Sequence, residues 1–200
     1  MTKMISGDWF PGAVPDNVVL GEGVHIETAA SFSRFRSRRP AAASFGDHSS
    51  AYVGCMFDLG PDAELHVGPW TLLNGLWVIA DACVSIGSHG LISWNVVVMD
   101  TYRASRDAAI RREQLKAFAR SRDPDRLACR NPADAPRGVI IEDNVWIGFD
   151  CCILPGVRIG AGSVIGARSV VACDIPPNTL AAGNPARIIR TLVNGGGVHD

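Results

Sequence analysis

Residues 139–173 read VIIEDNVWIGFDCCILPGVRIGAGSVIGARSVVAC, and an aliphatic residue occupies every sixth position of this stretch. These positions are Ile141, Ile147, Ile153, Ile159, Ile165 and Val171. A period of six fits neither the 3.6-residue turn of an α-helix nor the two-residue alternation of a single strand, but it is typical of parallel β-helix repeats. We therefore predict an all-β fold, a left-handed parallel β-helix in which each hexapeptide forms one flat side of a three-sided coil.

Two further features of this stretch agree with a narrow β-helix. The residue two before each aliphatic position is small, and we expect it to point inward as well: Val145, Cys151, Val157, Ser163 and Ser169. Glycine follows three of the aliphatic residues, and we expect these glycines at corners whose backbone torsions suit glycine. An ordinary sandwich of short strands is the alternative, but it does not explain the strict register.

The same spacing appears earlier in the chain. It runs through Val67, Leu73 and Ile79, slips by one residue, and resumes at Ile86, Ile92 and Val98. A first trace consists of Leu20, Ile26 and Phe32. The repeat therefore predicts one β-helix domain over residues 1–200.

Two segments break the pattern. Residues 103–137 lack the repeat, and within them strong helix formers accompany apolar residues, which predicts a loop excursion with a helix over 105–120. Residues 175–200 form a tail with turn signals at 176–177 and 184–185. For this tail we predict a short C-terminal helix whose apolar face consists of Ile188, Ile189 and Leu192.

Composition excludes several classes of protein. The 19 basic residues nearly balance the 20 acidic ones, so the formal net charge of -1 gives no general affinity for nucleic acid or a membrane surface. No segment is long and apolar enough to span a membrane, and the first residues lack the pattern of a signal peptide. The six cysteines are irregularly spaced without a CxxC pair, so we expect reduced thiols and a cytoplasmic protein.

Three strings in the C-terminal half carry a family resemblance. NVWIG, LPGV and AGNPAR follow one another between residues 139 and 190. In this order they resemble the C-terminal half of the maltose, galactoside and xenobiotic acetyltransferases, and a weaker resemblance covers residues 67–107. The resemblance implies acetyl-coenzyme A or another acyl-coenzyme A as co-substrate, a homotrimer that binds it between neighbouring β-helices, and a hydroxyl or amine of a small polar acceptor, such as a sugar or nucleotide sugar.

The candidate donor site lies in this half of the chain. Small corner residues leave backbone N–H groups and flat surface for an extended ligand such as pantetheine, and arginines suit its phosphates because the guanidinium donates paired hydrogen bonds. Alternatively, Arg187 and Arg190 are only the solvated face of the terminal helix. The predicted cofactor-binding residues are Trp146, Gly148, Gly166, Ala167, Arg168, Gly183, Asn184, Arg187 and Arg190.

The acceptor side departs from the family pattern. The histidine that the resemblance implies as general base falls on Arg103 or Ala104, and neither side chain is a base at neutral pH. The candidate replacements are Asp100, beside Tyr102 and Arg103, or His89 from a neighbouring subunit. Each has a plainer alternative, since Asp100 suits a loop-fixing role and a corner histidine is commonly solvated. A third and weaker candidate is Cys55, as an acylated thiol.

Two further observations concern metals and charge. The five histidines include no closely spaced pair, so we expect no metal site and rank a zinc hydratase low. Residues 103–137 hold ten basic and five acidic residues, a local charge of +5 that would suit an anionic acceptor or the coenzyme A phosphates. The rival to an acyltransferase is a catalytically inactive β-helix scaffold or ligand-binding protein, because the family histidine is absent.

Overall fold

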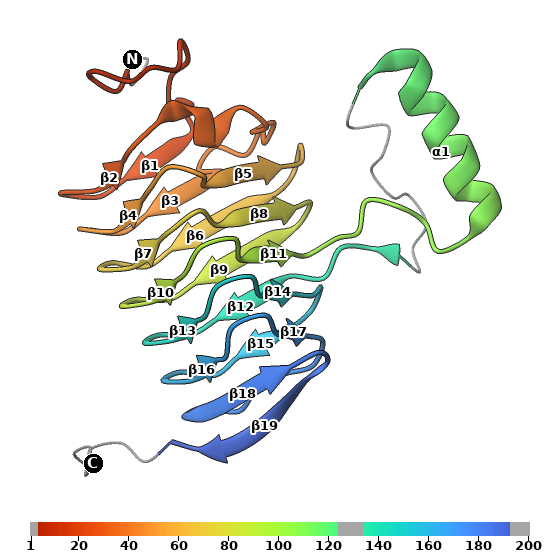
Figure 1. Ribbon diagram of the computed structural model, residues 1–200. Helices are drawn as coiled ribbons and strands as arrows, with labels where there is room; N and C mark the ends of the chain where they lie inside the picture. The colour runs from red at the N-terminus through yellow and green to blue at the C-terminus, as the bar shows by residue number, and fades with distance from the viewer. Residues whose placement is uncertain (1–3, 124–133, 193–200) are drawn as a thin grey trace.

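The computed structural model describes residues 4–123 and 134–192, and it shows a three-sided parallel β-helix with one helix outside it (Figure 1). In each coil the chain passes through a first, a second and a third sheet in turn. The first sheet consists of β1 (Val18–Leu20), β3 (Ala43–Phe45), β6 (Glu64–Val67), β9 (Cys83–Ile86), β12 (Val139–Ile141) and β15 (Arg158–Ile159).

The other two sheets complete the coils. The second sheet consists of β2 (His25–Ile26), β4 (Ser50–Ala51), β7 (Leu72–Leu73), β10 (Leu91–Ile92), β13 (Trp146–Ile147), β16 (Val164–Ile165), β18 (Thr179–Gly183) and β19 (Ala186–Thr191). The third sheet consists of β5 (Met56–Leu59), β8 (Trp77–Ala80), β11 (Val97–Met99), β14 (Cys152–Ile153) and β17 (Val170–Val171). A 3-10 helix, η1 (Ala29–Phe32), precedes the third sheet.

The interior consists of stacked aliphatic columns, as the repeat predicts. Ile147 pairs with Ile92 on one side and Ile165 on the other, and Ile153 lies between Val98 and Val171. All six aliphatic positions of residues 139–173 are buried, and so are the five small residues two positions earlier. Each side chain is covered from above and below by its equivalents, which is why the register is strict.

One hexapeptide position was assigned wrongly. Val78, not Ile79, is buried in the column beneath Val98, while Ile79 lies on the outer face of β8. Val78 follows Leu73 by five residues and precedes Ile86 by eight, so the spacing of six is broken on both sides of β8. Side chains alternate along a strand, so a shift of one residue exchanges the inner and outer faces.

The corner glycines are needed for space and not for unusual torsions, contrary to expectation. A Cβ on Gly148 would lie 2.7 Å from the backbone nitrogen of Ala167, and one on Gly166 would lie 2.8 Å from the Cβ of Ala182. The left-handed corner positions are held instead by residues such as Asn144, Asp150 and Arg168. The coils thus stack too closely for any side chain at the positions of Gly148 and Gly166.

The predicted excursion helix is confirmed as α1 (Ala108–Ser121). The Asp107 carboxylate caps it by accepting hydrogen bonds from the Ala109 and Ile110 N–H groups, and Arg122 ends it with a left-handed backbone. None of its residues is buried, and it projects away from the β-helix (Figure 1). Part of the predicted return loop, residues 124–133, lies outside the described residues.

The predicted C-terminal helix is wrong. Residues 186–191 form β19, which pairs antiparallel with β18 and extends the second sheet (Figure 1). The hydrogen-bonding edge of β18 provides register partners for all of β19 except Ile189, which lies at a bulge, and Ile188 and Ile189 are exposed instead of forming a buried helix face. The last predicted residues, 193–200, lie outside the described residues.

The described residues contain neither a membrane-spanning helix nor a disulfide bond. Within them, no helix has the length and apolar character needed to cross a membrane. The five cysteines of residues 4–123 and 134–192 are all free.

The stacked columns lead to a stability prediction. We expect Ile153→Ala to lower the free energy of unfolding by about 2–5 kcal/mol, because it leaves a cavity between Val98 and Val171. Ile79→Ala, on the outer face of β8 in the third sheet, is the matched control and should change it by much less. Urea unfolding of the three proteins measures both values, and equal losses would contradict the column.

Candidate functional site

The three-sided coil has three edges, and two of them hold most of the predicted site residues. The glycine edge lies between the second and third sheets and comprises residues 148–150, 166–168 and 183–184. The excursion edge lies between the third and first sheets, where the chain leaves after β11 and returns before β12. The third edge, between the first and second sheets, is called the histidine edge because His48 and His89 stand on it.

The glycine edge brings most of the predicted donor residues together. Gly148 lies against Ala167, and Gly166 lies against Ala182, so the edge presents a flat strip of stacked backbone. The Arg168 N–H donates to the Phe149 carbonyl at 2.8 Å, which fixes this arginine at the corner. Its guanidinium is exposed, 6.0 Å from the Phe149 ring and 3.6 Å from Asp150.

The β18–β19 turn continues this strip. Gly183 and Asn184 lie in the turn, and the Gly183 N–H donates to Ser169 Oγ at 3.0 Å. Arg187 is exposed and pairs with Ala182 beside the turn. Arg190 lies three residues further along β19, and Trp146 is exposed on the outer face of β13 before the edge. A thin chain with anionic groups fits this strip, since the backbone is accessible and two cations stand at its C-terminal coils.

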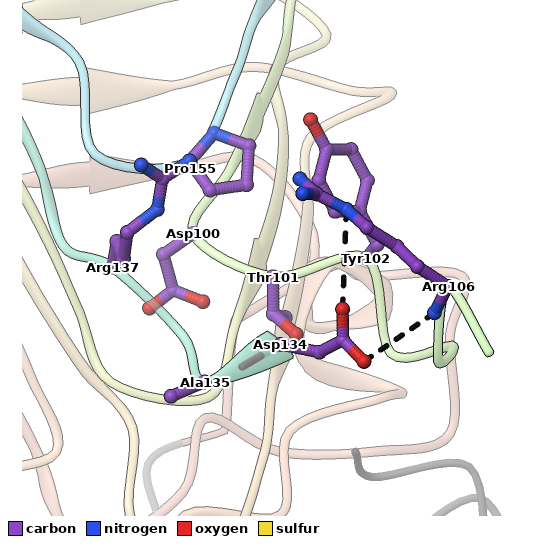
Figure 2. Close-up of a pocket in the computed structure, with 8 residues that line it drawn as sticks. All are labelled: Asp100, Thr101, Tyr102, Arg106, Asp134, Ala135, Arg137 and Pro155. Carbon is purple, nitrogen blue, oxygen red and sulfur yellow. Dashed lines mark hydrogen bonds and ion pairs between the residues drawn. The ribbon is translucent and has the colours of Figure 1, made fainter. Parts of the chain in front are cut away.

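The excursion edge contains a pocket of about 170 Å³. Figure 2 shows its lining: Asp100, Thr101, Tyr102, Arg106, Asp134, Ala135, Arg137 and Pro155. Asp134 accepts a hydrogen bond from Ser105 Oγ at 2.8 Å and lies 3.9 Å from Arg106 Nε, which holds the two arms of the excursion together. The pocket is therefore polar and contains both signs of charge.

Asp100 lines this pocket and also anchors the neighbouring coil. Its carboxylate oxygens accept hydrogen bonds from the Asp81 and Ala82 N–H groups at 2.8 and 2.7 Å. The Arg137 N–H donates to its carbonyl at 2.8 Å. Burial raises the pKa of Asp100, although hydrogen bonds from backbone N–H groups act in the opposite direction. The carboxylate is thus fixed in place and more basic than a solvated one.

Arg103 points into an ion-pair network and not into the pocket. Its guanidinium contacts Asp58 at 2.8 Å and Asp81 at 3.1 Å, and it donates to the Asp58 and Ala80 carbonyls. The arginine side chain is only 13% exposed. This network fastens the start of the excursion to two coils of the third sheet.

The other candidate bases lie elsewhere. His89 is exposed on the histidine edge with a left-handed backbone, so a single chain does not bring it to the pocket. Cys55 is buried, and burial raises the pKa of its thiol to about 11. That thiol is protonated at neutral pH, the opposite of an activated nucleophile. Tyr102 is half exposed at the pocket mouth, with the Arg106 guanidinium 5.9 Å from its ring.

The chain is similar in sequence and fold to known proteins. Residues 138–173 match the family model described as bacterial transferase hexapeptide (six repeats). The chain resembles the hexapeptide-repeat acetyltransferases. It is 32% identical over 151 residues to the galactoside O-acetyltransferase of Escherichia coli, covering 75% of this chain and 64% of the relative. A Staphylococcus aureus relative with an acetyltransferase name is 37% identical over 112 residues, 56% of either chain.

A solved structure agrees with this likeness. A galactoside acetyltransferase in complex with coenzyme A matches with a TM-score of 0.51 and 26% identity, over 88% of this chain and 66% of that one. The match supports the left-handed parallel β-helix. The chain spans less than two thirds of the length of both curated relatives.

The sequence did not reveal several residues of the site. At one of the two positions where the resemblance implies a histidine, Arg103 or Ala104, this chain has an arginine held by Asp58 and Asp81. Those two aspartates lie 45 and 22 residues earlier, and only the coil register brings them to Arg103. Asp134, Arg137 and Pro155 enter the pocket from the returning arm and the next coil. No motif marks Asp134 or Arg137, and Pro155 belongs to the LPGV string without having been assigned to the site.

The Arg103 network can be tested by its effect on stability. We expect Arg103→Met to lower the free energy of unfolding by about 1–3 kcal/mol, because it leaves the partly buried Asp81 carboxylate without this cation, while Asp58 keeps Arg36 at 2.9 Å. Arg106→Met, in the same loop but 74% exposed, should change it by about 0–1 kcal/mol. Thermal and urea unfolding measure the difference, and similar values for both variants would show that the network contributes little.

Proposed function

We propose that this chain is a coenzyme A-dependent acyltransferase that moves an acetyl or related acyl group to a hydroxyl or amine of a small polar acceptor. The flat glycine edge, with exposed Arg168 and Arg187 beside it, is the observation that carries the proposal. The backbone strip suits pantetheine, and the guanidinium groups suit phosphate. The identity with galactoside O-acetyltransferase supports the same activity.

The pocket at the excursion edge is the proposed acceptor site. Its carboxylates and the Arg106 and Arg137 side chains provide acceptors and donors for a polar molecule. Outside the pocket, the described part of the excursion carries four further basic residues on α1: Arg111, Arg112, Lys116 and Arg120. A sugar or a nucleotide sugar suits this combination, since the hydroxyls need partners and a phosphate needs positive charge. No nucleic acid, membrane or metal takes part in this proposal. The free cysteines among the described residues agree with a cytoplasmic location.

A homotrimer is the assembly that we propose, because one chain keeps the two edges apart. The third sheet separates the glycine edge from the excursion edge within a chain. In a ring of parallel β-helices, the second sheet of each chain can face the first sheet of its neighbour. The glycine edge of the first chain then meets the excursion edge of that neighbour. The histidine edge then points to the ring axis, and a closed cyclic interface results.

This packing predicts which outer faces are buried between chains. Leu91 on the second sheet is 37% exposed and Ile140 on the first is 40% exposed, so we expect Leu91→Glu and Ile140→Glu to weaken the trimer. Trp77→Glu on the third sheet, where the native side chain is 48% exposed, is the control and should leave it intact. Light scattering after gel filtration measures the mass, and dissociation by Trp77→Glu alone would refute the packing.

The chemistry needs a base for the acceptor proton. The acceptor oxygen or nitrogen attacks the thioester carbonyl, its proton passes to a base, and coenzyme A leaves as the thiol. Asp100 is the proposed base, since it lines the pocket and each carboxylate oxygen has a lone pair beyond the one bonded to backbone. His89 lies on the histidine edge, away from the proposed cleft. Tyr102 would contact the acceptor, and Arg103 would position the loop.

Turnover assays test both the activity and the base. Released thiol is followed with acetyl-coenzyme A and a panel of amino sugars, sugar nucleotides and small amines. We expect Asp100→Asn to lower kcat/KM by about 10²–10⁴ and His89→Gln to leave it unchanged. The wild-type rate should fall as the pH drops through the raised pKa of Asp100, because only the carboxylate accepts a proton.

Two controls separate catalysis from structure. Asparagine has one acceptor oxygen and cannot accept both backbone N–H groups, so circular dichroism and coenzyme A binding must show that Asp100→Asn remains folded. If Asp100 is only structural, Asp100→Asn lowers the rate equally at every pH. If Asp100 is the base, the variant also loses the fall in rate at low pH. Coenzyme A binding without thiol release on any acceptor would favour the inactive scaffold, to which the arginine at position 103 points.

A further inference from the structure

A cluster of three metal-ligating side chains lies on the outer face of the first sheet, the face that the proposed trimer places against the neighbouring chain, and it lies close to Asp100. Glu64 and His66 project from β6 on the same face, two residues apart. Cys83 begins β9 and is the register partner of Glu64. The carboxylate oxygen, imidazole nitrogen and thiol sulfur lie within 4.8 Å of one another.

A hydrogen bond orients the imidazole toward this cluster. Ser44, the register partner of His66 on β3, places its Oγ 2.9 Å from His66 Nδ1. When Nδ1 carries the proton and donates it to Ser44, the lone pair of Nε2 is free. Nε2 lies 3.6 Å from Glu64 Oε2, on the side of the cluster. Metal-binding histidines usually have such a second hydrogen bond, because it fixes the ring and its tautomer.

The charges around the thiol favour a cation. Burial raises the pKa of Cys83, and the negative charges of Glu64 and Asp100 raise it further. Arg39 is the one cation paired with Glu64 among the described residues, at 3.7 Å from Oε1, and it is half exposed. A divalent ion between the carboxylate and the sulfur would stabilise the thiolate directly, since a coordinated thiol loses its proton.

We propose that Glu64, His66 and Cys83 bind one zinc ion per chain, with a fourth position left for water or another ligand. One oxygen, one nitrogen and one sulfur are ligands that zinc accepts together, at bond lengths of about 2.0–2.3 Å. All three side chains are partly exposed, so small rotations close the cluster around the ion. The mixed set with sulfur and imidazole disfavours magnesium and calcium, which prefer oxygen ligands.

The proposal departs from the expectation of no metal drawn from the sequence. His66 and Cys83 lie 17 residues apart, and only the coil register brings them together. The ion would connect β6 to β9 where both strands leave the excursion edge. It would therefore stabilise the fold by mass action whether or not acyl transfer occurs.

Metal binding to the assembled protein tests the site directly. Protein purified with a chelator and a reductant is titrated with Zn²⁺ against a chromogenic chelator, and with Co²⁺ as a spectroscopic probe. We expect one ion per chain, a thiolate-to-cobalt charge-transfer band, and a rise in Tm with Zn²⁺. Cys83→Ser and His66→Gln should weaken Zn²⁺ binding at least tenfold, and Cys83→Ser should abolish the band. Ser44→Ala should weaken Zn²⁺ binding by about 10–100-fold.

Matched controls come from the same chain. Cys173→Ser removes an exposed cysteine, and His48→Gln removes an exposed histidine on another edge; both should bind Zn²⁺ like the wild type. Because the side chains of the cluster are partly exposed, the variants should have the wild-type Tm without metal. Binding that is substoichiometric, or that survives in both Cys83→Ser and His66→Gln, would overturn the proposal.

Discussion

The rest of the structure depends on the stacking of aliphatic residues from one coil onto the next. A single hexapeptide side buries nothing alone, because its inward residue needs an equivalent above and below it. Ile147 and Ile153 satisfy this condition in the middle of their columns, and the close contacts of Gly148 and Gly166 set how tightly the coils approach. The distance between the stacked coils therefore also determines where each residue on the outer face lies.

The charged and metal-ligating side chains lie on the outer face of the coil, and the coil register decides which of them become neighbours. Residues one coil apart become neighbours although 17 or more positions separate them in sequence. Arg103 with Asp58 and Asp81 is one such group, and Glu64 with His66 and Cys83 is another. A rigid coil therefore supplies fixed geometry to side chains that it does not need for its own core.

The interior could be predicted from sequence better than the outer face. The columns through Ile141 to Val171 follow from a period of six alone, because burial leaves the chain no alternative register. Ile79 was misplaced by one residue, since β8 is apolar on both faces and periodicity does not distinguish them. The tail was taken for a helix because Ile188 and Ile189 suit a helix face as well as a strand, and only the free edge of β18 decides between them. The pocket could not be predicted, since Asp134 and Pro155 reach it from separate segments.

The excursion leaves and rejoins the β-helix at almost the same point, for Asp100 and Arg137 are joined by a backbone hydrogen bond of 2.8 Å. Its helix buries no residue, so the coil loses no core when this segment changes length or composition. Insertions and exchanges in α1 are therefore expected to be close to neutral for folding, while the two arms that carry it form much of the pocket wall. If the pocket is the acceptor site proposed above, selection can change the segment that lines it while the β-helix beneath stays constant, and chains with the same β-helix can diverge in the molecules that they bind.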